Sequence, residues 1–180
     1  MAKPLVATGH FTGCFGCHMS ILDIDERILD LVELVEFDKS PINDIKTFSR
    51  PVDIGIIEGG VSNDENVEVL KDFRENCKIL VAIGECALTG GVPCMRNTVP
   101  LQECLNEAYL SGPTVAAGSI IPNDPELPIL LDKVYPCHEV VKLDYHLPGC
   151  PPSADTLWAA FVALLTGEEV GLFYEFIKYD

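Results

Sequence analysis

The sequence lacks any long apolar run. No stretch of this chain approaches the ~20 consecutive apolar side chains that are needed to cross a bilayer. The first residues also lack the extended apolar core of a secretory signal peptide, because a cysteine-containing loop already begins at Gly13. We therefore expect a cytoplasmic protein with no membrane span.

Positive charge is scarce as well. The chain has 12 Lys and Arg residues against 28 Asp and Glu residues, and its formal net charge is -16. Nucleic-acid binding needs Lys and Arg clustered opposite the phosphates, and this chain has no such cluster, so we exclude that function. The acidity fits a solvated surface or attraction to a basic partner subunit.

Internal repeats and a second domain are also absent. The 180 residues suffice for one domain with a substantial core. Apolar runs alternate with helical patterns along the chain, which predicts an α/β fold: a flavodoxin-like, doubly wound parallel sheet forming a single domain over residues 1–180. The expected strands are 5–8, 35–37, 52–57, 78–83 and 140–143. The expected helices are 21–35, 64–73, 101–110 and 154–166, with coil at 112–128 and a short tail at 168–180.

Three helix starts carry a capping signal. Ser20 is expected to cap a helix whose apolar face runs from Ile21 to Val35. Asn63 lies in the Ser-Asn-Asp cap of the next helix, and Ser153 is expected to cap the last one. The strand expected at 140–143 leads toward this last helix.

Eight cysteines are present, and four of them follow expected strands in glycine-containing loops. Cys14 and Cys17 lie in GCFGC, Cys86 lies in GEC and Cys150 lies in PGCPP. Because the carboxyl ends of neighbouring parallel strands meet at one edge of a sheet, we expect the four thiols to converge. Four thiolates at one point suit an iron–sulfur cluster or a zinc ion.

The cysteine pattern leaves three kinds of site open. Zinc sites usually use two CxxC pairs, and this chain has one. A thioredoxin-like dithiol needs only Cys14 and Cys17 and leaves the other two without a role, whereas a [4Fe–4S] cluster uses all four. The remaining cysteines share no spacing and are expected to be small buried side chains: Cys77, Cys94, Cys104 and Cys137.

Three further residues lie near these cysteines in the expected fold. Glu58 ends a strand beside two glycines, and its carboxylate is a candidate for proton relay, for setting a cluster's potential, or for accepting backbone N–H bonds. His10 and His18 flank the CxxC loop; each is either a solvent or interface side chain, the commoner role of such a histidine, or a donor to a cluster sulfur. The segment Thr8–Gly13 is similar to a flavin phosphate loop, so an FMN-binding module is an alternative.

The order CxxC, Gly-x-Cys, Pro-Gly-Cys-Pro-Pro resembles the small subunit of [NiFe]-hydrogenases. The stretch Gly13–Glu26, GCFGCHMSILDIDE, looks most like the soluble NAD-reducing (bidirectional) enzymes, and Ile57–Gly60 and Cys86–Gly91 resemble the family's Glu-Gly turn and third-ligand loop. The homologous subunit of respiratory complex I is an alternative. It uses adjacent cysteines in its first loop, unlike the CxxC found here.

The resemblance implies an electron-transfer subunit of a hydrogen:NAD+ oxidoreductase with no catalytic residue of its own. It implies one proximal [4Fe–4S] cluster, with Cys14, Cys17, Cys86 and Cys150 as metal ligands. By the same resemblance, the nickel–iron site lies on a large partner subunit. Electrons then pass to diaphorase subunits that carry FMN and further iron–sulfur clusters.

Overall fold

A five-stranded parallel sheet forms the centre of the computed structural model, which describes residues 3–168. The strand order is β2-β1-β3-β5-β7, and every neighbouring pair is parallel. This is the flavodoxin-like, doubly wound order, with ligand sites expected at the carboxyl ends of the strands. The strands are β1 (Leu5–His10), β2 (Glu36–Phe37), β3 (Val52–Glu58), β5 (Cys77–Ile83) and β7 (Tyr145–Leu147).

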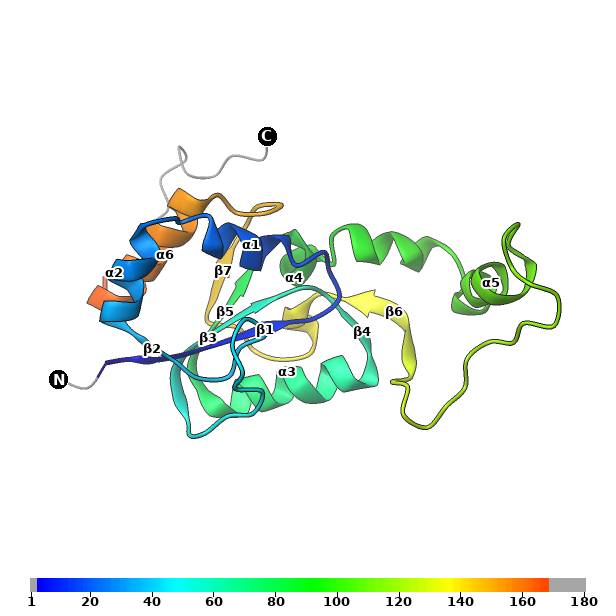
Figure 1. Ribbon diagram of the computed structural model, residues 1–180, viewed down its shortest axis with the longest axis horizontal. Helices are drawn as coiled ribbons and strands as arrows, with labels where there is room; N and C mark the ends of the chain where they lie inside the picture. Colours follow the sequence, from blue (N-terminus) through cyan, green and yellow to red (C-terminus); the bar gives the residue numbers. More distant parts are fainter. Residues whose placement is uncertain (1–2, 169–180) are drawn as a thin grey trace.

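Helices cover both faces of the sheet, as Figure 1 shows. Successive strand side chains point to opposite faces, so Ile57 packs in the same cluster as Phe73 of the helix on one face. Ile56 packs instead with Phe161 on the other face. Burial on both faces explains why these strands are almost continuously apolar. The first face carries α3 (Asp64–Asn76), and the second carries α1 (Gly16–Leu22), α2 (Arg27–Leu34) and α6 (Ala154–Thr166).

The helix expected from Ile21 to Val35 is two helices, and the expected cap at Ser20 is wrong. α1 begins at Gly16, and the intervening turn contains Asp25 at a φ of 61°. Ser20 lies inside α1, where its buried hydroxyl donates to the carbonyl oxygen of Pro152 at 2.5 Å. This contact with a distant loop replaces the local cap. The earlier start places Cys17 in the first turn of α1.

The last strand is also displaced from its expected place. Residues 140–143 are not a strand; a short 3-10 helix, η3 (Cys137–Glu139), precedes them, and β7 follows them. Asp144 stands immediately before β7, and its carboxylate accepts from the backbone N–H of Leu80 at 2.8 Å. The contact with Leu80 of β5 therefore determines that the last strand begins after Asp144. The β-branched Val140 and Val141 instead pack against the core.

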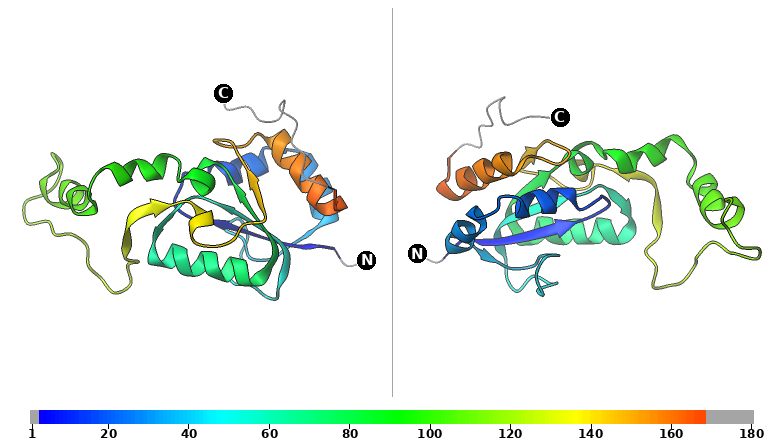
Figure 2. Two further views of the ribbon diagram at one scale, coloured as in Figure 1. Left: turned by 180° about the vertical axis from the view of Figure 1, so that it is seen from behind. Right: turned by 45° about the horizontal axis from the view of Figure 1, so that its top comes forward.

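An unpredicted antiparallel pair joins β4 (Val61–Asn63) to β6 (Leu130–Tyr135). Between β4 and β6 the chain forms α3, β5 and α4 (Glu85–Thr89). It then forms an arm, residues 92–129, that projects away from the sheet (Figures 1 and 2). The arm contains η1 (Val92–Thr98), α5 (Leu101–Asn106) and the π-helical turn η2 (Glu107–Ser111). The helix expected at 101–110 is thus α5 with η2, and the coil expected at 112–128 is confirmed.

The other local expectations are confirmed. β2 lies within the range 35–37, and the side chains of Asn63 and Ser153 cap α3 and α6 by accepting from Asn66 and Thr156. Among residues 3–168, no helix is both long and apolar enough to cross a bilayer. Residues 169–180, which make up nearly all of the tail expected at 168–180, lie outside the described part of the chain.

Candidate functional site

The four predicted cysteines lie in three loops at the carboxyl edge of the sheet. Cys14 follows β1, Cys17 is in the first turn of α1, Cys86 is in α4 directly after β5, and Cys150 follows β7. Cys14 and Cys150 are exposed, whereas Cys17 and Cys86 are partly buried. All eight cysteines fall within the described residues, and each is a free thiol.

Glycines allow the sulfurs to approach the neighbouring backbone. A Cβ at Gly84 would overlap the Sγ of Cys17, so the third-ligand loop touches the second cysteine. A Cβ at Gly13 would lie 3.9 Å from the Sγ of Cys86, and one at Gly91 would lie 2.9 Å from it. The first and third loops are therefore in contact, as convergence of the ligands requires.

The loops that carry Cys86 and Cys150 are joined by backbone hydrogen bonds. The N–H of Gly84 donates to the carbonyl oxygen of Leu147 at 2.8 Å, and the N–H of Glu85 donates to that of Gly149 at 2.9 Å. The Glu85 carboxylate in turn accepts from the N–H of Gly149 at 3.4 Å. These contacts set Cys86 and Cys150 beside each other.

The first loop is attached to the end of β3. The N–H of Phe11 donates to the carbonyl oxygen of Glu58 at 2.9 Å, and Thr12 and Gly60 exchange two backbone bonds of 2.9 and 2.8 Å. Since Ser20 also bonds Pro152, α1 is fastened to the loop that carries Cys150. The three cysteine-bearing loops thus brace one another through protein contacts alone.

Burial raises the pKa of the inner thiols. Desolvation raises the pKa of Cys17, and Glu58, Cys86 and Cys14 act in the same direction. Desolvation also raises the pKa of Cys86, with further contributions from Cys150 and Cys14. Burial and the neighbouring Glu58 carboxylate therefore both disfavour a thiolate at Cys17 when no metal centre is bound.

The donor set fits an iron–sulfur cluster. Four free sulfurs meet at one edge, and glycine backbone lies against three of them. A positively charged metal centre would offset the burial that raises the pKa of Cys17 and Cys86, because it stabilises their thiolate forms. Backbone amides near glycine are also the usual hydrogen-bond donors to cluster sulfurs.

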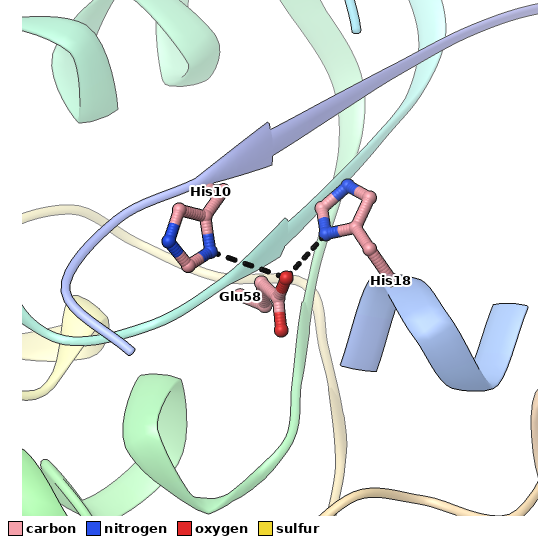
Figure 3. A group of neighbouring side chains, drawn as sticks. All are labelled: His10, His18 and Glu58. Atoms are coloured by element: carbon pink, nitrogen blue, oxygen red, sulfur yellow. Dashed lines mark hydrogen bonds and ion pairs between the residues drawn. The ribbon is translucent and has the colours of Figure 1, made fainter. Parts of the chain in front are cut away.

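The buried carboxylate of Glu58 lies next to Cys17 and between two histidines, His10 and His18 (Figure 3). Glu58 Oε1 is 2.5 Å from Nδ1 of His18 and 3.2 Å from Nδ1 of His10, and Oε2 accepts from the backbone N–H of Cys17 at 3.0 Å. Burial works to raise the pKa of Glu58, but hydrogen bonds from His10 and His18 outweigh it and hold the pKa well below its usual range. The group is therefore a carboxylate at neutral pH.

Of the two histidines, His18 does not have the sulfur-donor role considered from the sequence, whereas the role of His10 stays a prediction. Both point Nδ1 at Glu58, and Nε2 of the fully buried His18 is 3.0 Å from Oγ1 of Thr8. His18 thus uses both ring nitrogens within the protein, not on a cluster sulfur. Glu58 does accept a backbone N–H, as one of its expected roles required.

Sequence reasoning missed Thr8, Ser40 and Glu85. The hydroxyls of Thr8 and Ser40 lie 2.7 Å apart and extend the histidine network, but nothing in their local sequence indicates it. Glu85 stands between Gly84 and Cys86, and that position was a usable signal. Of the other cysteines, Cys77 and Cys137 are buried as expected, whereas Cys94 and Cys104 are partly exposed.

Comparisons with known proteins agree with this geometry. Residues 14–164 match the family described as "NADH ubiquinone oxidoreductase, 20 Kd subunit". The delta subunit of the NAD-reducing hydrogenase HoxS of Cupriavidus necator is 47% identical over 180 residues, covering 99% of this chain and 86% of that protein. The iron-sulfur subunit of the F420-non-reducing hydrogenase of Archaeoglobus profundus is 36% identical over 172 residues, covering 86% of this chain and 54% of that protein.

A solved structure shares the whole fold. A chain in the crystal structure of an NAD+-reducing [NiFe]-hydrogenase in the H2-reduced state superposes with a TM-score of 0.96, at 49% identity and with 99% of both chains covered. The chain therefore belongs to the family of the 20 Kd subunit of NADH ubiquinone oxidoreductase and, within it, to the small subunits of NAD-reducing [NiFe]-hydrogenases.

Proposed function

We propose that this chain is the electron-transfer subunit of an NAD-reducing [NiFe]-hydrogenase and that Cys14, Cys17, Cys86 and Cys150 hold one proximal [4Fe–4S] cluster. The observation that carries the proposal is the meeting of four free thiols from three mutually braced loops at the carboxyl edge of the sheet. The name of the Archaeoglobus relative, an iron-sulfur subunit, supports the type of cofactor.

When bound, such a cluster accepts and passes on one electron at a time. The residues of this chain supply its ligands and its surroundings. Cys17 and Cys86 are partly buried against Gly84 and Gly91, which limits the access of water to the inner side of the site. Cys14 and Cys150 are exposed, which leaves the outer side accessible to a partner subunit.

A chain with one cluster needs redox partners on both sides. We propose a hydrogenase large subunit with the nickel–iron site on one side, and diaphorase subunits with FMN and further clusters on the other. Exposed apolar side chains on the arm support docking of a partner, since Val92 and Met95 are each 69% exposed. The apolar tail from Leu172 to Tyr179, a second candidate for this contact, lies outside the described residues. Because NAD+ is the proposed acceptor, we assign the complex to the cytoplasm.

The ligand set is tested by single substitutions in the anaerobically purified complex. Replacing any one of the four ligand cysteines by Ala should abolish the stable cluster, because it opens an otherwise closed set of thiolates. Cys94→Ser and Cys104→Ser are the matched controls, since both thiols are free and partly exposed but lie outside the set. Iron and sulfide analysis with EPR spectroscopy measures the result. Full cluster content in Cys150→Ala would contradict the proposal.

A further inference from the structure

Glu58 lies within hydrogen-bond reach of the proposed ligand Cys17, although Glu58 belongs to a strand and Cys17 to a helix. Glu58 is 3% exposed and ends β3, while Cys17 lies in the first turn of α1. Its Oε2 accepts from the backbone N–H of Cys17 at 3.0 Å, and its Oε1 faces Nδ1 of both His10 and His18. Because a carboxylate can only accept, each Nδ1 carries the hydrogen and donates it. Figure 3 shows both rings turned toward this single oxygen.

The two histidines hold this carboxylate in one position. His18 has no exposed surface, its second nitrogen is bonded to Thr8, and its ring is stacked on that of Phe15 at 4.6 Å. The ring of His10 packs edge-on against Phe15 at 5.0 Å. The carboxylate therefore keeps its place beside Cys17 through contacts that involve both β1 and α1.

The hydrogen bond to Glu58 matters because the Cys17 N–H would otherwise be free to donate to a cluster sulfur. Backbone N–H groups beside a cluster donate to its sulfurs, and such bonds, like nearby positive charge, raise the reduction potential. The amide of Cys17 is committed to Glu58 instead, and a buried negative charge lies next to the ligand. Both effects favour the oxidised cluster, which carries the smaller negative charge.

We propose that Glu58, held by His10 and His18, is a positioning residue that fixes the N-terminal turn of α1 at Cys17 and lowers the reduction potential of the cluster. This inference rests on the proposed function, because it presupposes a cluster on Cys17.

A metal ion held by the three side chains is the competing interpretation. Their ligand atoms all lie within 4.8 Å of one another. However, Glu58 and His18 are in direct contact at 2.5 Å. Two ligands that each stand about 2.0–2.2 Å from an ion lie farther apart than that in tetrahedral geometry. Direct hydrogen bonds therefore account for the group without an ion.

The test is an EPR-monitored redox titration of the purified complex, following the signal that Cys86→Ala removes. Glu58→Gln keeps an oxygen that can accept from Cys17 but removes the charge. We expect normal iron and sulfide content and a midpoint potential shifted to a more positive value. Asp53→Asn is the matched control at the opposite end of β3, where the carboxylate accepts from Leu5 and Lys78, and it should leave the midpoint unchanged.

His10→Phe provides an independent test with the opposite sign. The His10 side chain is 28% exposed, so its replacement by a ring of similar shape is tolerated better than a change at His18. Loss of one donor leaves the Glu58 charge less compensated, and the midpoint should shift to a more negative value. This variant decides the question if Glu58→Gln fails to assemble its cluster.

The possible outcomes separate the two proposals. An unshifted midpoint in Glu58→Gln at full cluster content overturns the inference alone, as does an unshifted or more positive midpoint in His10→Phe. If the wild-type complex contains no EPR signal that depends on Cys86, the proposed function fails, and the inference fails with it.

Discussion

The absence of a side chain at Gly84 allows the loop that carries Cys86 to approach Cys17. The φ of Gly84 is +80°, a conformation that L side chains rarely adopt, and a Cβ there would overlap the Sγ of Cys17. Gly118, in the arm, has nearly the same φ of +83° but has nothing within 4 Å of the Cβ position. Substitutions at the two glycines therefore share the free-energy cost of backbone strain, but only a substitution at Gly84 adds steric overlap with Cys17.

Gly84→Ala should lose most of the cluster proposed for this chain, and with it that cluster's share of the iron and sulfide, because the added methyl displaces the Sγ of Cys17. Gly118→Ala should keep full cluster content, although each variant is destabilised by about 1–3 kcal/mol for a non-glycine residue at positive φ. Iron and sulfide content per purified complex is the measurement. Equal content in the two variants would show that Gly84 is needed for its backbone conformation only.

The position of β7 depends on side chains outside the strand itself. It is three residues long and lies at the edge of the sheet, yet it leads to the fourth ligand. The Asp144 carboxylate accepts from Leu80 N–H at 2.8 Å and from Arg74 Nη1 at 2.7 Å. Arg74 also donates to the carbonyl oxygens of Cys77, Lys78 and Lys142. This cluster joins the end of α3 to the starts of β5 and β7.

Asp144→Asn should lower the free energy of unfolding by about 1–2 kcal/mol at pH 7, because charge-assisted hydrogen bonds to Arg74 and Leu80 are weakened. Urea unfolding of the isolated chain, followed by fluorescence of Trp158, measures this, since Trp158 is the chain's single tryptophan. Asp44→Asn, at an exposed carboxylate, is the control and should cause no measurable change.

The effect of Asp144 should also depend on pH. Burial works to raise its pKa, but hydrogen bonds from Arg74 and Leu80 outweigh this and lower the pKa below the usual value. A lowered pKa contributes stability above the unfolded-state pKa of about 3.9, and this stability is lost as the pH falls through the folded-state value. The difference between wild type and Asp144→Asn should therefore shrink when unfolding is measured at successively lower pH. A constant difference down to about pH 2, below the usual range of an Asp carboxyl, would contradict this role.

For the molecule as a whole, the number of ligand sets limits what the chain can do alone. Outside the proposed set, Cys77 lies in β5 and Cys137 begins η3, while Cys94 and Cys104 lie in η1 and α5 of the arm. These four are distributed over separate elements and form no second set. With the one cluster proposed for this chain, we therefore expect an electron that reaches it to leave through another subunit.

The chain purified with only its large partner should oxidise H2 with artificial dyes but should not reduce NAD+. Adding the flavin and iron–sulfur partners should restore NAD+ reduction, because they supply the missing path. The measurement is H2-dependent dye reduction and NADH formation by the two-subunit pair, before and after reconstitution. NAD+ reduction by the pair without additions would refute the relay role.

Much of this protein was determined by local sequence. Apolar runs covered on both faces specify the central strands, and Asn63 and Ser153 cap their helices through bonds to residues only three positions away. Parallel strands also bring their carboxyl ends to one edge whatever the details of the loops. The doubly wound fold and the choice of the four candidate cysteines could therefore be predicted, since both follow from strand ends and spacing.

Only the tertiary structure decided the features that depend on distant partners. Ser20 is 132 residues from Pro152, Asp144 is 64 residues from Leu80, and Glu58 is 40 residues from His18. In each case a buried polar group (the Ser20 hydroxyl, the Leu80 N–H or the Glu58 carboxylate) takes a partner that the fold brings near, because an unpaired buried polar group costs about 1–3 kcal/mol. These contacts hold Ser20 inside α1, fix the start of β7, and direct Nδ1 of both histidines at Glu58.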